Sequence, residues 1–442
     1  MADVAVLVYG VIAKGFHKMP APRQPELIQP EHLIPRLKWE QLFSFLPQWP
    51  DAAPKRGRKP VDRNALLKAS IYQRLTGQRF LRQLCSQLGE SPPLMAALGF
   101  DPYCPPPPLE RFSSFLADTD YTALLWIFIC LVQGLLDAGV IKAEHVGFDS
   151  CAIPSWVREN NLKTAFHHAR YDKNIPPKAD PDARLGVRIH FPSPEQKKVH
   201  YFWGYRHHAL VDLEAELPLW VFTEPCNIGE TTLAIPLLDA VAVTFGLHFT
   251  SVCGDAEYDS EKIIRHIQDT IEADAYIPKN IRNAGDQEGF TRKNQEVFCP
   301  ANLKMYRHGK MTVKGITYIQ YCCPFYKGTK PDLLMCPVDH PKFHQQKGCN
   351  HLWRLTDNPR ERIPYGTTEF KTNYNRRTAV ERVFSRLRAI TLQEPAVRGL
   401  ASVRNHCIIS DIAVLLVALA AWRLEKPDKI RFLRTFVPYV LD

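Results

Sequence analysis

Three acidic residues stand in sequence contexts where a carboxylate is unusual. Glu381 lies among five arginines in YNRRTAVERVFSRLR, residues 374–388. Asp149 interrupts the apolar stretch HVGFDSCAI, and Asp255 follows the stretch HFTSVCG. A buried carboxylate is costly unless a cation accompanies it. Two Asp and one Glu together form an all-oxygen ligand set, which suits two Mg²⁺ or Mn²⁺ ions and phosphodiester chemistry.

The arginine-rich stretch contains neither Gly nor Pro and predicts one continuous helix over about residues 372–391. At about 100° per residue, four side chains share an arc of about 60° on this helix: Tyr374, Arg377, Glu381 and Arg388. One interpretation is a solvated basic helix in which Glu381 pairs with Arg377. The other is a carboxylate ligand flanked by groups that hold phosphate.

The two aspartates also have structural interpretations. Asp149 fits a salt bridge at the edge of a sheet, and Asp255 fits a cap on the helix that follows it. Glu257 is the reserve candidate if Asp255 is not a ligand, whereas Asp259 is expected to cap a helix. The joint occurrence of three acids favours the metal site over three separate structural explanations.

Composition limits the class of protein. The chain has 442 residues, 45% of them hydrophobic, so it can bury a large core and form two or three domains. Its 56 basic against 46 acidic residues, a net charge of +10, favour a polyanionic partner: nucleic acid first, an anionic membrane surface second.

The apolar runs 123–136 and 412–422 fall short of the ~20 residues of a membrane span and predict buried core helices. We recognise no secretion signal, and we expect the twelve cysteines to be reduced or metal-bound.

The N-terminal third predicts helices. Residues 1–30 form a Pro-rich lead, and residues 31–139 form an all-helical domain. Within it, Asp62 is a plausible N-cap, Gly77 is a break, and a second helix starts at about residue 79. The pair resembles a helix-turn-helix, and we expect residues 31–139 to be a DNA-binding domain.

From residue 140 the pattern changes. Five segments rich in β-branched and aromatic residues predict strands: 145–153, 198–213, 217–224, 248–255 and 273–280. They predict an α/β fold with a mixed five-stranded sheet covered by helices. Asp149 then lies inside the first strand and Asp255 at the C-terminal end of the fourth, where sites of open α/β sheets assemble.

Further helices complete the predicted organisation. They span about residues 231–245, 259–271, 372–391 and 399–423. The catalytic domain would comprise 140–280 plus 371–425, an insertion would occupy 281–370, and 426–442 would form a tail.

The order strand Asp, strand Asp, helix Glu, with Tyr-x2-Arg-x3-Glu-x6-basic around the last acid, resembles the DDE transposases of bacterial insertion sequences. The resemblance is to the group with a Tyr-Arg-Glu-Lys signature, and it covers about residues 55–425. It implies a ribonuclease-H-like catalytic domain, with Asp149, Asp255 and Glu381 as catalytic metal ligands. The residue that corresponds to the family's Lys is Arg388, which keeps the charge but presents a planar fork to phosphate.

The resemblance implies a function and partners. The protein would bind the terminal inverted repeats of an insertion sequence, cleave DNA by two-metal hydrolysis and join the ends to target DNA by transesterification. We expect a homodimer on DNA, no membrane, and a bacterial cytoplasmic, nucleoid-associated location. The alternatives are a metal-dependent nuclease of the same fold and a domesticated DNA-binding protein without catalysis.

Two further features suggest DNA or metal contacts. Arg206 on the second strand is a candidate phosphate contact. The segment PKRGRKP resembles arms that enter a minor groove, although a solvated linker explains it as well; its cations are Lys55, Arg56, Arg58 and Lys59.

The insertion concentrates thiols. Cysteines there suggest a structural zinc site, although no Cys-x2-Cys pair is present and reduced thiols in a β-rich subdomain are the alternative: Cys299, Cys322, Cys323, Cys336 and Cys349.

Overall fold

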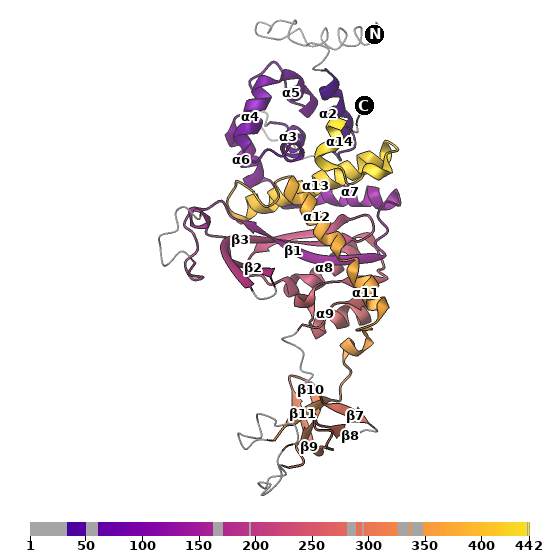
Figure 1. The fold of residues 1–442 in the computed structure, drawn as a ribbon. Helices are drawn as coiled ribbons and strands as arrows, with labels where there is room; N and C mark the ends of the chain where they lie inside the picture. Colours follow the sequence, from indigo (N-terminus) through magenta and orange to yellow (C-terminus); the bar gives the residue numbers. More distant parts are fainter. Residues whose placement is uncertain are drawn as a thin grey trace. The chain divides into compact units, whose positions relative to one another are not determined.

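The computed structural model describes residues 33–49, 61–161, 171–193, 196–280, 289–293, 296–325, 336, 348–439 and 441. The chain divides into two compact units. Unit 1 comprises Met1–Ala143, Phe148–Leu247 and Thr378–Asp442, and unit 2 comprises Glu144–Gly147 and His248–Arg377. Figure 1 traces the elements along the chain.

The central sheet is mixed, with strand order β2-β3-β1-β5-β6 and β4 paired to β3. In unit 1 the pairs β2–β3 and β3–β4 are antiparallel. In unit 2 the first residues of β1 run parallel to β5, and β5 runs parallel to β6. The strands are β1 (His145–Pro154), β2 (Arg184–Ser193), β3 (Gln196–Asp212), β4 (Leu217–Pro225), β5 (Ser251–Cys253) and β6 (Asp274–Tyr276).

A glycine lets β3 approach β1. A Cβ atom on Gly204 would lie 2.2 Å from the carbonyl oxygen of Ile153, so no larger residue fits without a backbone shift. The Ser155 N–H donates to the Trp203 carbonyl at 2.9 Å just beyond the end of β1. This close approach fixes the strand that carries Asp149.

Unit 1 is built around a long apolar helix, α13 (Leu400–Arg423), which packs on α7, α6, α3 and β4. Figure 1 shows α13 and α7 side by side. The other helices of unit 1 are α2 (Leu33–Phe43), α3 (Arg63–Leu75), α4 (Leu81–Glu90), α5 (Pro92–Leu98), α6 (Leu109–Asp118), α7 (Tyr121–Asp137), α8 (Glu230–Phe245), α12 (Thr378–Ala389) and α14 (Leu433–Tyr439). By length and composition α13 could cross a membrane, and so could α6 with α7 if that bent pair is one span. However, 94% of the apolar window of α13 is buried inside the protein, which is typical of a core helix.

Unit 2 holds the first residues of β1, the parallel strands β5 and β6, and a small β subdomain. Its helices are α9 (Glu261–Arg265), continued by a π-helical turn to Thr270, and α11 (Thr368–Asn375). The β strands of the insertion are β7 (Thr291–Lys293), β8 (Glu296–Phe298), β9 (Tyr306–Val313), β10 (Ile316–Cys322) and β11 (Asn350–Arg354). The last three form an antiparallel sheet in the order β11-β10-β9.

The predicted fold class is confirmed, with differences in detail. All five predicted strands form, and the sheet gains a sixth, β2. Asp62 does cap α3, because its side chain accepts the Asn64 N–H at 2.9 Å, and Gly77 has the left-handed φ of 71° expected of a break. The prediction that Asp259 caps a helix is wrong. Ser260 is the N-cap of α9, and the buried Asp259 carboxylate instead pairs with Arg360 at 2.6 Å.

The prediction of one continuous helix over 372–391 is also wrong. Helix α11 ends at Asn375 and α12 begins at Thr378. The N–H groups of Arg376 and Arg377 donate to carbonyls three residues back, at 3.1 and 3.0 Å, which tightens the chain into a turn. The arc calculated for a continuous helix therefore does not apply across this turn.

Candidate active site

Helix α12 presents its charged residues in two directions. At about 100° per residue, Glu381 and Arg388 lie within about 20° of each other, whereas Arg382 and Arg386 point away by about 100° and 140°. Its buried face consists of Ala379, Val380, Val383, Phe384 and Leu387. The arginines around Glu381 therefore serve at least two different purposes.

Arg382 and Arg386 anchor the helix to the sheet. Both donate to the carboxylate of Glu216, just before β4, at 2.8 and 2.6 Å, and Arg386 also donates to the Glu216 carbonyl. Arg431 lies 3.2 Å from the same carboxylate. Burial alone would raise the pKa of Glu216, but the hydrogen bonds from Arg386 and Arg382 outweigh it and lower that pKa. This ionised, paired carboxylate fixes the rotation of α12.

The face of α12 that carries Glu381 and Arg388 borders a cavity. Glu381 and Arg388 line a cavity of about 380 Å³ together with Asp149, on β1, and Arg188, on β2. Ser150, Cys151, Ala152, Phe384 and Gln393 complete the lining. Two acids and two guanidiniums therefore meet at one opening in unit 1. Glu381 and Arg388 are both solvent-exposed there, within reach of a large ligand.

A carboxylate that sequence analysis missed lies beside Asp149. Ligand oxygens of Asp149 and Glu230, the first residue of α8, lie within 4.8 Å of each other. The Ser150 hydroxyl donates to Glu230 at 2.9 Å, and the Ser150 N–H donates to Asp149 at 2.7 Å. The only sequence signal for Glu230 is its position at the start of a predicted helix, where acids are common.

Arg206, the predicted phosphate contact on β3, pairs with Glu230. Its Nη1 donates to the Glu230 carboxylate and, at 3.1 Å, to the Ser150 hydroxyl. The same guanidinium lies within hydrogen-bond distance of the Val187 carbonyl, at 3.4 Å. In this structure Arg206 therefore balances an acid next to Asp149, and its contact with phosphate stays a prediction.

Arg188 is a second residue that sequence analysis missed. Its Nη2 donates to the Ala152 carbonyl at 2.8 Å, and its guanidinium lies 5.1 Å from the centre of the Phe202 ring. These contacts hold the cation at the mouth of the cavity that Glu381 and Arg388 line. No sequence signal was available, because β2 was not among the predicted strands.

Three further predicted site residues, Asp255, Tyr374 and Arg377, lie in unit 2. Asp255 follows β5 and accepts the Glu257 N–H at 2.9 Å, so it does cap the turn after it. Burial raises the pKa of Asp255, against the Glu257 N–H and the nearby charge of Arg377, which lower it. Arg377 lies 5.7 Å from the centre of the Tyr374 ring. The convergence of Asp255 with Asp149 and Glu381 stays a prediction.

The five cysteines of the insertion separate into groups. Cys299, Cys323 and Cys349 share one buried cluster in unit 2. Cys322 instead contacts the Tyr306 hydroxyl and helps to raise the pKa of Tyr306, for which burial is the largest cause. Cys336 is partly exposed. The predicted basic arm, residues 54–60, lies outside the described residues.

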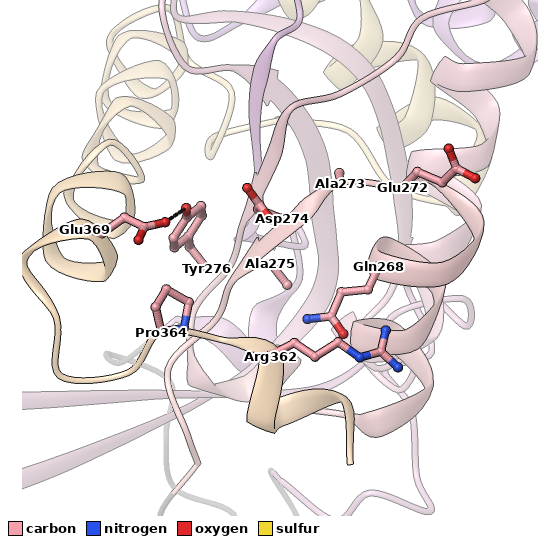
Figure 2. Close-up of a pocket in the computed structure, with 9 residues that line it drawn as sticks. All are labelled: Gln268, Glu272, Ala273, Asp274, Ala275, Tyr276, Arg362, Pro364 and Glu369. Atoms are coloured by element: carbon pink, nitrogen blue, oxygen red, sulfur yellow. Dashed lines mark hydrogen bonds between the residues drawn. The ribbon is translucent and has the colours of Figure 1, made fainter. Parts of the chain in front are cut away.

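Unit 2 also contains a cavity of about 420 Å³ that is lined by acids (Figure 2). Figure 2 shows the Tyr276 hydroxyl donating to Glu369, at 2.8 Å; Asp274 and Glu272 also line the cavity. Arg362, at its edge, is held by Asp269 and by Asp357, the latter at 2.6 Å. This surface has the wrong charge for a phosphate backbone.

Comparison with known proteins finds two families along the chain. The family described as "Transposase DDE domain" matches residues 186–417, and "Transposase domain (DUF772)" matches residues 23–117. The chain is also similar to a solved structure titled "Cryo-EM structure of piggyBac transposase synaptic complex with hairpin DNA (SNHP)". That likeness has 10% identity and a TM-score of 0.34, and it covers 95% of this chain and 87% of the other. No curated protein matches the chain.

Proposed function

The chain belongs to the family of proteins with a transposase DDE domain, which matches more than half of its residues, and on this premise we propose how it acts on DNA. It binds the terminal inverted repeats of its own element, cuts the DNA by metal-assisted hydrolysis and joins the ends to target DNA. The observation that carries the proposal is the cavity in unit 1 where Asp149, Glu381 and Arg388 meet.

The donor chemistry of this cavity fits hard divalent cations. Asp149 and Glu381 offer carboxylate oxygens, and Asp149 is half-buried beside a further acid, Glu230. Such oxygens are the ligands that Mg²⁺ and Mn²⁺ prefer. We assign Asp149 and Glu381 as ligands and add Asp255 as the third. When bound, two such ions would supply activation of water or a 3′-hydroxyl and stabilisation of the leaving oxygen.

The cations around the acids suit the polyanionic substrate. Arg388 and Arg188 flank the acids in the cavity lining, where their guanidiniums can donate to phosphate oxygens and fix the DNA backbone. Arg206 orients Glu230 through its ion pair. Tyr374, near the end of α11, and Arg377, in the turn after that helix, add candidate DNA contacts. On DNA the protein acts as a homodimer, which brings two element ends together.

The test is an assay on DNA that carries the element's ends, with Mg²⁺ or Mn²⁺ added. We expect nicks at the ends that depend on the metal, followed by products in which the ends are joined to a second DNA. A nuclease of the same fold would give nicks without joined products. A binding protein without catalysis would retain the DNA and leave it intact, and either result would contradict the proposal.

A further inference from the structure

A fully buried arginine links two helices of unit 1. Arg74, on α3, is 1% exposed, and its Nη1 donates to the Ser70 carbonyl at 2.7 Å. Its Nε donates to the hydroxyl of Ser410, on α13, at 3.1 Å. Its Nη2 donates to His406, also on α13, at the ring Nδ1 (3.0 Å) and at the carbonyl (3.2 Å). Because a buried charge is costly without such hydrogen bonds, these contacts hold α3 and α13 together.

The imidazole of His406 extends this contact to the end of α12. Arg74 can only donate, so Nδ1 of His406 is the acceptor and the ring proton lies on Nε2. Burial, and after it the charge of Arg74, lower the pKa of His406 well below its ordinary value, which keeps the ring neutral. The Nε2–H group faces the carbonyls of Thr391 and Leu392, each at 3.2 Å. Arg74, His406 and these two carbonyls therefore form one chain of hydrogen bonds.

The turn that His406 contacts is strained. Thr391 has a φ of 70°, in the left-handed region that a β-branched residue rarely adopts. The turn closes α12, because the Leu392 N–H donates to the Leu387 carbonyl at 3.1 Å and the Glu394 N–H donates to the Thr391 carbonyl at 3.0 Å. Helices often end on a left-handed residue, but that residue is usually Gly. Thr391 therefore keeps this conformation only with support from its surroundings.

Two residues of the cavity lining flank this turn. Arg388 stands before Thr391, and Gln393 follows directly after Leu392. A second contact joins the same parts of the chain, because Arg79, between α3 and α4, pairs with Glu394 at 3.1 Å. The placement of Arg388 and Gln393 at the cavity therefore depends on contacts that lie outside it.

We propose that His406 is a positioning residue for the DNA-cleavage site. With Arg74 behind it, the neutral ring holds the strained turn at Thr391 and so keeps Arg388 and Gln393 at the cavity. Gln393 then donates a hydrogen bond to a phosphate oxygen beside the one that Arg388 holds. The roles of Arg388 and Gln393 rest on the proposed function, whereas the hold of His406 on the turn does not depend on DNA.

Two substitutions separate the two nitrogens of the ring. His406→Asn keeps an acceptor where Nδ1 meets Arg74 but lacks the Nε2 donor, whereas His406→Gln can place an amide N–H at the carbonyls of the turn. Hydrogen-exchange mass spectrometry on the full chain without DNA measures the effect on the turn. We expect peptides that cover residues 389–394 to exchange about threefold to tenfold faster in His406→Asn and at nearly the wild-type rate in His406→Gln.

Ser410→Ala is the matched control, because it removes a contact of Arg74 away from the turn and should leave the exchange of residues 389–394 unchanged. Thr391→Gly removes the strain at φ 70°, so it should restore slow exchange when it is added to His406→Asn. Unchanged exchange of residues 389–394 in His406→Asn overturns the proposal. Equally faster exchange throughout unit 1, with no recovery from Thr391→Gly, shows a general role in the fold and also overturns it.

A double-mutant cycle on end binding connects the turn to the cavity. His406→Asn should weaken the binding of element ends about threefold to tenfold. In a chain that already carries Arg388→Ala it should weaken binding by less than about twofold, because the residue that it positions is gone. Effects that multiply in full would contradict the role at the cavity. If the wild-type protein neither binds nor cuts the ends, the proposed function fails, and hydrogen exchange still decides whether His406 holds the turn.

Discussion

Asp149 on β1 and Glu381 on α12 line the same cavity, although 231 intervening residues separate them in the chain. The strand is fixed by the close approach of β3 at Gly204, and the helix is fixed by the ion pairs of Arg382 and Arg386 with Glu216. Both acids thus come from elements held in unit 1 by contacts outside the cavity. Substitutions at those contacts should therefore change the stability of the fold and the placement of the two acids without removing either carboxylate.

The Glu216 cluster should contribute to stability. Glu216→Ala removes the carboxylate partner of Arg386 in a largely buried position and leaves only the backbone carbonyl, so we expect the free energy of unfolding to fall by about 2 to 3 kcal/mol. The loss is smaller than for a fully buried pair because Arg382 is half-exposed. Urea denaturation measures the change. Glu214→Ala is the matched control, because Glu214 is exposed and pairs with Lys142 only at 3.7 Å, and it should change stability by less than about 0.5 kcal/mol.

The same cluster gives this stability difference a pH dependence. The pKa of Glu216 is lowered in the folded protein from its ordinary value of 4.5. The contribution of ionised Glu216 to the free energy of unfolding is therefore complete above pH 4.5 and is lost as the pH falls through the lower pKa of the folded protein. The difference in unfolding free energy between the wild type and Glu216→Gln should decrease below pH 4.5. A difference that stays constant down to low pH would contradict the ionised pairing.

The two arginines at the cavity should act on DNA rather than on the fold. Arg188→Ala and Arg388→Ala each remove a charge-assisted contact, so we expect end binding to weaken about tenfold and nicking to fall with it. Arg388→Lys should keep most of both, since Lys is the residue in the signature that this chain resembles. Arg265→Ala, which breaks surface pairs with Glu261 and Asp357, is the control. Unchanged end binding in both Ala variants would remove these arginines from the interface.

We expect the basic segment at residues 54–60 to contribute to the salt dependence of DNA binding. Replacing Lys55, Arg56, Arg58 and Lys59 with Ala should weaken DNA binding and flatten the slope of log K against log salt by up to about 0.9 per lost phosphate contact. Fluorescence anisotropy across a salt series measures this slope. If the slope does not change, the segment is a solvated linker.

Local patterns in the sequence were sufficient for much of the fold. The five predicted strands and the buried helices at 123–136 and 412–422 all form, because alternation and apolar runs report burial directly. The turn at Arg376 and Arg377 could not be predicted, since no Gly or Pro marks it and packing decides it. Strand β2 was missed, and with it Arg188.

The site was predictable only in part, for a related physical reason. Asp149 and Glu381 stand out because carboxylates in apolar or basic surroundings are costly. Glu230 and Glu216 do not, because an acid near the start of a helix or beside a strand is ordinary in sequence. Their roles depend on Arg206 and on Arg382 and Arg386, which reach them only in the folded protein.

The central claim is that Glu381 binds metal for DNA cleavage, and Glu381→Gln tests it most directly when nicking and end binding are measured on the same preparation. The Gln side chain keeps the shape and removes the charge, so we predict that metal-dependent nicking falls by several orders of magnitude. End binding should survive or tighten, because a negative charge facing phosphate is gone. Arg377→Ala should instead weaken binding and nicking together. Near-normal nicking by Glu381→Gln, with at most about 0.5 kcal/mol lost in stability as for a surface ion pair, would contradict the assignment.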